Sequence, residues 1–186
     1  MTILQQELTL EAFMNLPERK PALEYEEGAV SQKMSPRGKH SGLQAMLSGR
    51  LNQFARPRRL AFAFSELRAT FGGRSYVPDV SLYRWDRIPR DAAGRIADDF
   101  FEPPDLAIEI VSPKQSVTGQ VRRCLWYVAN GVPLALLIDP ADASVLLFRP
   151  NAAPRALRGV APIDVSDVLP GFELTVQELF DFLDLR

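Results

Sequence analysis

Two acidic residues stand out because each is the only charge in a stretch of apolar side chains. Glu109 interrupts the run 106–111, and Asp79 interrupts the run 76–83. Short apolar runs beside prolines predict buried strands rather than helices. An unpaired carboxylate is very costly inside such a strand. We therefore expect each acid to lie at an exposed strand end, to pair with a partner, or to hold a cation.

The chemistry open to these acids depends on whether their strands are neighbours. Two carboxylates on adjacent strands supply half of a site for a hard cation such as Mg²⁺ or Mn²⁺, which prefers oxygen ligands and is completed by water and phosphate. Zinc would need more than His40 and Cys124. A magnesium ion could generate hydroxide and neutralise charge on a phosphodiester. The spacing alone is equally compatible with a strand-end acid and a turn acid of purely structural role.

The remaining periodicity predicts the elements that must position the two acids. Their order predicts an α/β or α+β fold with a mixed sheet in a single domain, residues 1–186. The predicted elements are a helix over 9–16, a hairpin over 22–34 turning at Gly28, a helix over 39–54, one bent or two short strands over 60–71, the Asp79 strand, a polar surface excursion over 84–102, the Glu109 strand, a helix over 115–130, a strand over 134–138 paired with 144–149, an edge strand within 155–165 and a closing helix capped by Thr175. The predicted inward faces of the two long helices include Met46 in the first and Val117 and Leu125 in the second.

Length and composition limit the class of protein. The chain has 186 residues, 46% hydrophobic and 24% charged, as in an ordinary soluble globular domain. One cysteine excludes an intrachain disulfide and a cysteine-built metal cluster. No apolar run approaches the ~20 residues that cross a bilayer, and no signal segment is apparent, so we expect a cytoplasmic protein without membrane contact. The net charge of −1 gives no global positive field, so any phosphate binding must be local.

Several short motifs occur in a specific order along the chain. They are Glu-Tyr-Glu-Glu-Gly at 24–28, Ser-Pro at 35–36 followed by His40, Val-Pro-Asp-Val at 77–80, Pro-Asp-Leu-Ala-Ile-Glu-Ile-Val-Ser-Pro at 104–113, Tyr127 with Gly-Val-Pro at 131–133, and Ile-Asp-Pro at 138–140. In this order and spacing the set resembles the Uma-two family of restriction-endonuclease-like proteins, within the PD-(D/E)XK nuclease superfamily. The resemblance runs from about residue 10 to residue 182.

The resemblance implies a restriction-endonuclease-like core that cuts nucleic acid, most often DNA, with Mg²⁺ or Mn²⁺. Asp79 matches the acid of the Pro-Asp element, and Glu109 matches the second acid that holds the same ion. The Ile110 carbonyl is a further candidate ligand. Glu24 matches the glutamate of the family's early hairpin and is a candidate third carboxylate, with a solvated turn residue as its alternative. A homodimer is expected by analogy, because cutting both strands needs two sites.

The resemblance departs from the superfamily pattern at its lysine. The position two residues after the second acid is Val111, and in this family a lysine on the following helix, four residues before the tyrosine, stands in for it. That position is Arg123, with Gly119 where the family usually has an aspartate. Arginine cannot act as a base, because its pKa is too high, but it can stabilise a phosphate. Lys114 is a further possibility, although its turn would carry it to the surface.

Two polar residues complete the predicted site. Gln120 shares a helical face with Arg123 and Tyr127, so both it and Arg123 can point toward substrate. His40 matches a family histidine and is either a structural hydrogen-bonding residue or a contact for phosphate. Two alternatives to a nuclease remain: a catalytically silent nucleic-acid-binding or regulatory module, favoured by Val111, Gly119 and Arg123, and an interaction protein whose acids are held in salt bridges.

Overall fold

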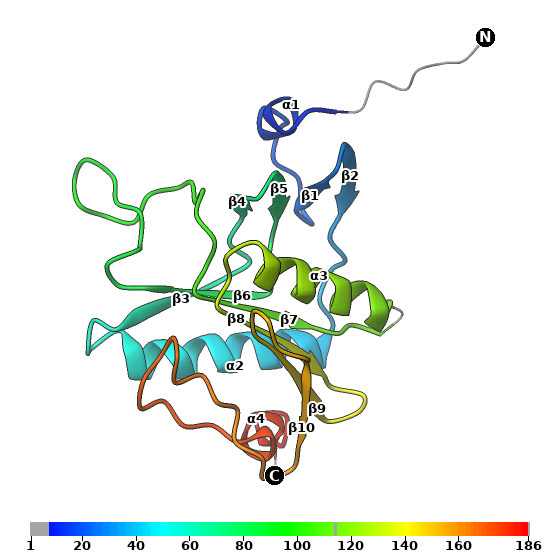
Figure 1. Cartoon of the computed structure of the whole chain (residues 1–186), viewed down its shortest axis with the longest axis vertical. Coiled ribbons are helices and arrows are strands. Elements are labelled where there is room, and N and C mark those ends of the chain that lie inside the picture. Colours follow the sequence, from blue (N-terminus) through cyan, green and yellow to red (C-terminus); the bar gives the residue numbers. More distant parts are fainter. Residues whose placement is uncertain (1–7, 114, 186) are drawn as a thin grey trace.

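The computed structural model describes residues 8–113 and 115–185, so Lys114 lies outside the described residues. Four helices and ten strands are described (Figure 1). The helices are α1 (Leu10–Met14), α2 (Gly38–Ala55), α3 (Val117–Ala129) and α4 (Val176–Asp181). The strands are β1 (Leu23–Glu26), β2 (Ala29–Gln32), β3 (Ala61–Ser65), β4 (Ala69–Phe71), β5 (Arg74–Tyr76), β6 (Val80–Arg84), β7 (Leu106–Ile110), β8 (Leu134–Asp139), β9 (Ser144–Phe148) and β10 (Arg155–Arg158).

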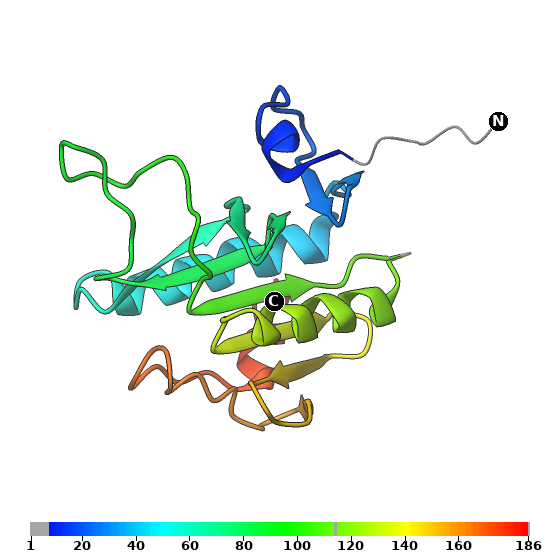
Figure 2. The ribbon, with the colours of Figure 1, turned by 45° about the horizontal axis from the view of Figure 1, so that its top comes forward.

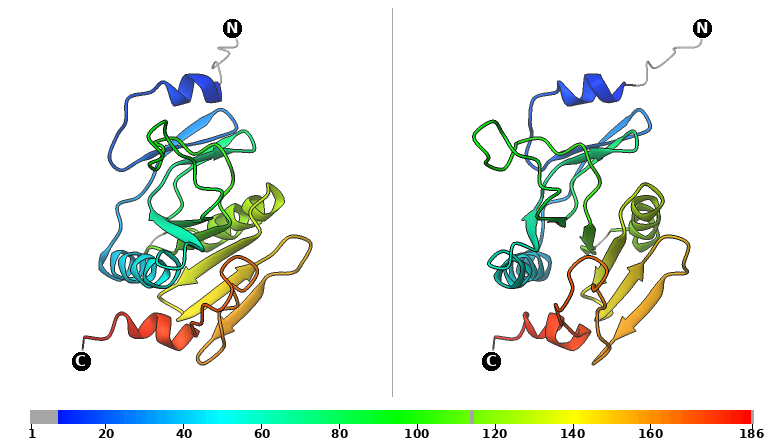
Figure 3. Two further views of the ribbon diagram at one scale, coloured as in Figure 1. Left: turned by 90° about the vertical axis from the view of Figure 1, so that its left-hand side faces the viewer. Right: turned by 60° about the vertical axis from the view of Figure 1, so that its left-hand side comes forward.

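A six-stranded mixed sheet forms the centre of the molecule, in the order β10-β9-β8-β7-β6-β3. β7 and β8 are parallel because α3 crosses between them, and the other neighbours in this sheet are antiparallel. Figure 3 shows α2 and α3 on opposite sides of this sheet. The predicted fold class, a mixed sheet flanked by helices, is confirmed.

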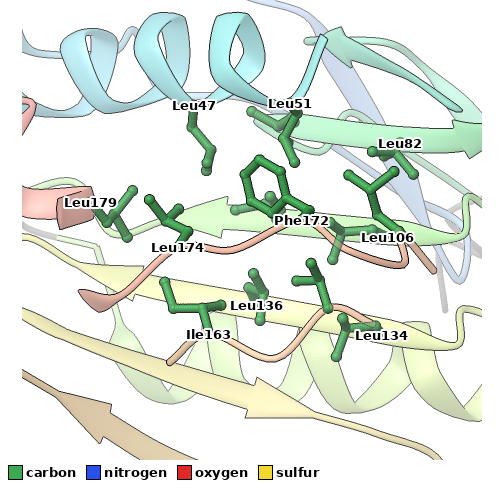
Figure 4. Packing of buried hydrophobic residues seen from close by; sticks show 14 of the residues in the cluster. Leu47, Leu51, Leu82, Leu106, Leu134, Leu136, Ile163, Phe172, Leu174 and Leu179 are labelled. Carbon is green, nitrogen blue, oxygen red and sulfur yellow. The ribbon is translucent and has the colours of Figure 1, made fainter. Parts of the chain in front are cut away.

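The face of the sheet toward α2 carries the larger hydrophobic core. Alternate residues of β7 and β8 point to this face, among them Leu106 and Leu136, and meet Leu47 and Leu51 of α2 (Figure 4). The prediction that Met46 also points inward is wrong, because its side chain is 51% exposed. Leucines at spacings of four already fill the narrow stripe of α2 that contacts the sheet.

The opposite face of the sheet is covered by α3 and by a second, four-stranded sheet in the order β2-β1-β5-β4 (Figure 2). Cys124 and Tyr127 are the buried residues of α3. Val117 and Leu125 were predicted to be buried but are 43% and 41% exposed, because α3 contacts the sheet along a narrower stripe than its apolar periodicity suggests. β5 and β6 connect the two sheets through residues 77–79.

The polar excursion between β6 and β7 is anchored rather than free. Ile88 and Phe100 are buried against Tyr83, and the buried Asp105 accepts ion-paired hydrogen bonds from Arg84 and Arg87.

Among the described residues, no helix is long and apolar enough to cross a membrane.

Candidate active site

The central position of the Glu109 strand is confirmed, and its neighbour β6 brings Asp79 close to it. β6 and β7 pair in antiparallel register with Val80 opposite Ile108. Asp79 lies one residue before β6, in the bend that joins the two sheets, and not inside a strand as predicted. Its Oδ2 accepts a hydrogen bond of 2.7 Å from the backbone N–H of Ile110, the residue after Glu109. The pairing of these strands thus brings the Asp79 carboxylate to the backbone of the residue that follows Glu109.

Asp79 is buried and ionised among cationic and polar partners. Its Oδ1 lies 2.5 Å from Lys33 Nζ and 3.2 Å from His40 Nε2, and only 1% of the residue is exposed. Burial alone would raise the pKa of Asp79, but the interactions with His40 and Lys33 outweigh it and hold this pKa below its ordinary value. The carboxylate is therefore charged at neutral pH.

Lys33 is a site residue that was not predicted from the sequence. It follows β2 directly, and its ammonium group also donates a hydrogen bond of 2.7 Å to the backbone oxygen of Val77. Burial acts to lower the pKa of Lys33, but the neighbouring carboxylates, Asp79 first, raise it above its ordinary value, so the side chain stays protonated. One signal in the sequence was available: the chain has four lysines against eighteen arginines, which makes each lysine worth testing.

Glu109 is buried on the α3 side of β7, with 2% of the residue exposed. Its Oε1 accepts a hydrogen bond of 2.7 Å from the Tyr127 hydroxyl and lies 3.6 Å from the Arg123 guanidinium. Burial raises the pKa of Glu109 to about 7, an effect that Arg123 opposes and that the negative charge of Asp79 reinforces. Near neutral pH Glu109 is therefore partly protonated, mainly because it is buried.

Arg123 joins Glu24 to this centre. Its two terminal nitrogens donate hydrogen bonds of 2.9 and 2.7 Å to the two carboxylate oxygens of Glu24, which also accepts 2.9 Å from the backbone N–H of Val77. The guanidinium lies over the ring of Tyr76, 4.4 Å from its centroid. Burial would lower the pKa of Arg123, but the surrounding acids raise it further above its already high value. The cluster thus brings together Glu24, Lys33, Asp79, Glu109 and Arg123.

The two remaining predicted residues lie at the edges of this cluster. His40 is buried, with Nδ1 2.8 Å from the Ser112 hydroxyl and Nε2 beside Asp79. That Nε2 atom is outside hydrogen-bond geometry, so it has no hydrogen-bond partner among the residues that the structure describes. The amide oxygen of Gln120 on α3 is likewise buried without a described partner. His40 thus lies against Asp79 and binds Ser112, and Gln120 has unused hydrogen-bonding capacity.

The donor set of the cluster fits a hard divalent cation in type. The carboxylates of Asp79 and Glu109 are the oxygen ligands that Mg²⁺ and Mn²⁺ prefer, and a cation beside Glu109 would favour the charged form that burial disfavours. Within the ranges 8–113 and 115–185, however, no three His, Cys, Asp or Glu side chains are grouped closely enough to form a metal cage on their own. An ion at this position would therefore take the rest of its ligands from water, backbone or substrate.

Comparisons with known proteins show the family of the chain. A search of curated proteins found no match. Among solved structures, a protein from Anabaena variabilis described as a "putative nuclease belonging to DUF820" is 40% identical, with a TM-score of 0.90 over 94% of this chain and 98% of that one. A DrdV–DNA complex is 12% identical, with a TM-score of 0.39 over 79% of this chain and 12% of that chain, and carries no weight. Residues 10–177 match the family Uma2, described as "Putative restriction endonuclease". The chain is therefore a member of the Uma2 family.

Proposed function

We propose that this protein is an endonuclease that hydrolyses phosphodiester bonds of nucleic acid, with DNA as the proposed substrate and Mg²⁺ or Mn²⁺ as its cofactor. The observation that carries the proposal is the convergence of three buried acids from distant parts of the chain, Glu24, Asp79 and Glu109, around two protonated cations. Membership of the Uma2 family supports the reaction class. A homodimer belongs to the proposal because cutting both strands needs two sites.

The acids would hold the metal ion. Asp79 and Glu109 supply carboxylate oxygens, with the Ile110 carbonyl as a further candidate. When bound, such an ion lowers the pKa of a water molecule and neutralises charge that develops on the phosphate. Glu24 would act indirectly, through Arg123, because both of its oxygens accept hydrogen bonds from that guanidinium and orient it.

The two cations would act on the phosphate and not on the water. Lys33 and Arg123 keep their protons near neutral pH, because the acids around them raise both pKa values. Neither can therefore serve as general base. Each can instead stabilise the negative charge of the pentavalent phosphate, a contribution that is large when the charged donor is fixed in place before the reaction. Lys33, 2.5 Å from Asp79, supplies an ammonium group to the site, which the apolar Val111 cannot.

A second candidate function is a nucleic-acid-binding or regulatory protein that does not cut. The salt bridges Lys33–Asp79 and Arg123–Glu24 favour it, because they already satisfy carboxylates that a metal ion would otherwise bind. An interaction protein with purely structural ion pairs is the third reading. It predicts no change in melting temperature in Mg²⁺ or Mn²⁺, whereas a bound ion stabilises the folded state by mass action.

Nicking of supercoiled plasmid tests the proposal. The wild-type protein in Mg²⁺ or Mn²⁺ should nick the plasmid, EDTA should stop the reaction, and Asp79→Ala and Glu109→Ala should each lose it. Asp164→Ala, at an exposed acid outside the cluster, is the control and should cut like wild type. Cutting that survives both cluster substitutions would come from a contaminant. A folded wild-type protein that binds DNA and never cuts it would establish the second candidate.

A further inference from the structure

A cavity of about 630 Å³ adjoins the acidic cluster between the small sheet and α3. Arg123 belongs to both, because its guanidinium binds Glu24 and approaches Glu109 while the side chain also lines the cavity. The other principal walls are Arg74 and Tyr76 from β5 and Gln120, Arg122 and Trp126 from α3. This volume is in the range of natural ligand sites.

The charge of the cavity favours an anion. Three arginines line it against one carboxylate, Glu26. Glu26 pairs with Arg74 at 2.6 Å, and Arg123 pairs with Glu24. Arg122 is exposed and makes no ion pair with any described residue, so its charge is available to a ligand. Arginine is well suited to this task because its planar fork matches phosphate oxygens.

Two further features of α3 point to a nucleic-acid ligand. Gly119 lines the cavity without a side chain, so this part of the wall carries no charge that would repel a phosphate. The buried amide oxygen of Gln120, unpartnered among the described residues, offers an acceptor for a donor that a phosphate group does not carry. Base amino groups carry such donors in DNA, and RNA adds its 2′-hydroxyls.

We propose that this cavity is the subsite that holds a nucleic-acid phosphate next to the scissile one, bound by Arg122 and Arg123, while Gln120 accepts a hydrogen bond from the adjoining nucleoside. The subsite rests on the nuclease function proposed above. Arg123 then bridges two neighbouring phosphates, with one side toward the acids and the other toward the cavity. The substrate strand therefore leaves the cluster along α3.

Gly119 offers a sharp test because a side chain fits there. A Cβ at this position would meet only Ser116 atoms, at 3.5 and 3.6 Å, which is ordinary contact. Gly119→Asp should fold and place a carboxylate in the cavity, and Gly119→Asn is its uncharged match. Arg122→Glu reverses the available charge, and Arg155→Glu does the same to an exposed arginine on β10.

Binding is measured by fluorescence anisotropy with a fluorescein-labelled single-stranded 20-mer of DNA in EDTA, so that no cutting occurs. We expect Gly119→Asp and Arg122→Glu to weaken binding by about tenfold and Arg122→Glu to lower the salt dependence by about one phosphate contact. Gly119→Asn should bind more tightly than Gly119→Asp, and Arg155→Glu should match wild type within about twofold. Inorganic phosphate at equal ionic strength should compete only weakly.

The outcomes separate this subsite from the proposed nuclease function. Equal affinities for Gly119→Asp and Gly119→Asn, or equal losses for Arg122→Glu and Arg155→Glu, would overturn the subsite even if wild type nicks plasmid. Complete displacement of DNA by phosphate would reassign the cavity to the free anion and overturn it too. Binding with the expected pattern but without nicking in Mg²⁺ would keep the subsite and refute hydrolysis. A wild-type protein that neither binds nor nicks would refute both.

Discussion

Replacement of Lys33 by methionine tests the electrostatics of the cluster most directly. Methionine keeps the apolar stem and removes the charge that lies 2.5 Å from Asp79 Oδ1. The side chains of Lys33 and Asp79 are only 10% and 2% exposed, so water cannot replace the lost partner. Lys33→Met therefore leaves a buried carboxylate with the Ile110 N–H and a nearby His40 as its remaining support.

The expected cost follows from that uncompensated charge. Removal of one partner from a buried ion pair typically costs about 3–5 kcal/mol. His40 and the partial exposure of Lys33 place the expected loss at the lower end, about 3 kcal/mol at pH 7. For a chain of this length that corresponds to a fall in melting temperature of about 6–12 °C. The cost should shrink at pH 5, because the pKa of Asp79 rises without Lys33 and the group can take up a proton.

A double-mutant cycle measures the coupling energy between Lys33 and Asp79. It compares urea denaturation of wild type, Lys33→Met, Asp79→Asn and the double variant. Asp79→Asn keeps an oxygen that can accept from Ile110 and removes the charge. The double variant should therefore be more stable than the sum of the single losses implies, by about 2 kcal/mol. A Lys33→Met protein within about 1 kcal/mol of wild type, or a coupling near zero, would refute the reasoning. Mg²⁺ should raise the melting temperature of Lys33→Met more than that of wild type.

Three further predictions follow from the same structure. Burial raises the pKa of Glu109 from 4.5 to about 7, so between these pH values the folded protein retains a proton that the unfolded chain releases. As pH rises from 4.5 to 8 in EDTA, the free energy of unfolding of wild type should therefore fall by up to about 3 kcal/mol relative to that of Glu109→Gln. The same pH dependence of unfolding by urea in both proteins would contradict this. Tyr127→Phe removes the donor to Glu109 Oε1 and should cost about 1–3 kcal/mol by urea denaturation at pH 8. The loss should be smaller in the Glu109→Gln background, where the oxygen that accepts this hydrogen bond is no longer charged, and equal losses in the two backgrounds would contradict this. Leu47→Ala, at a 3% exposed position of α2, should cost about 2–5 kcal/mol, whereas its neighbour Met46→Ala, 51% exposed, should stay within about 0.5 kcal/mol, and equal losses would refute the orientation of the helix.

The backbone of the site could be predicted from the sequence because its signals are local. The apolar run between prolines correctly predicted β7. The N-cap of α1 and the turn at Gly28 were also predicted correctly, and the order of the elements indicated the mixed sheet. The pairing of β6 with β7 was left open by the sequence, because two similar strands with one acid each need not be neighbours, and the structure shows that they are. Placing Asp79 in a strand failed, because Val77 and Pro78 read as apolar strand residues while they form the crossing between sheets.

The partners of the acids could not be predicted, because they depend on how the two sheets pack. Lys33 reaches Asp79 across 46 residues of sequence, and Arg123 reaches Glu24 across 99. No periodicity within either segment encodes such a contact. The same holds for the faces of α3: Leu125 matches the helical repeat, yet the buried stripe of this helix consists of Cys124 and Tyr127, and Leu125 is 41% exposed.

The cluster lies where residues 77–79 cross from the small sheet to the main sheet, so its side chains come from both sheets. Glu24 and Lys33 belong to the small sheet's hairpin and its continuation, whereas Glu109 belongs to the main sheet. Slight separation of these layers would disassemble the ion pairs without breaking any strand of the central sheet. On heating, the proposed nuclease activity should therefore disappear before the circular dichroism of the main sheet changes. A compound that binds between the layers should inhibit that activity without contacting Asp79 or Glu109.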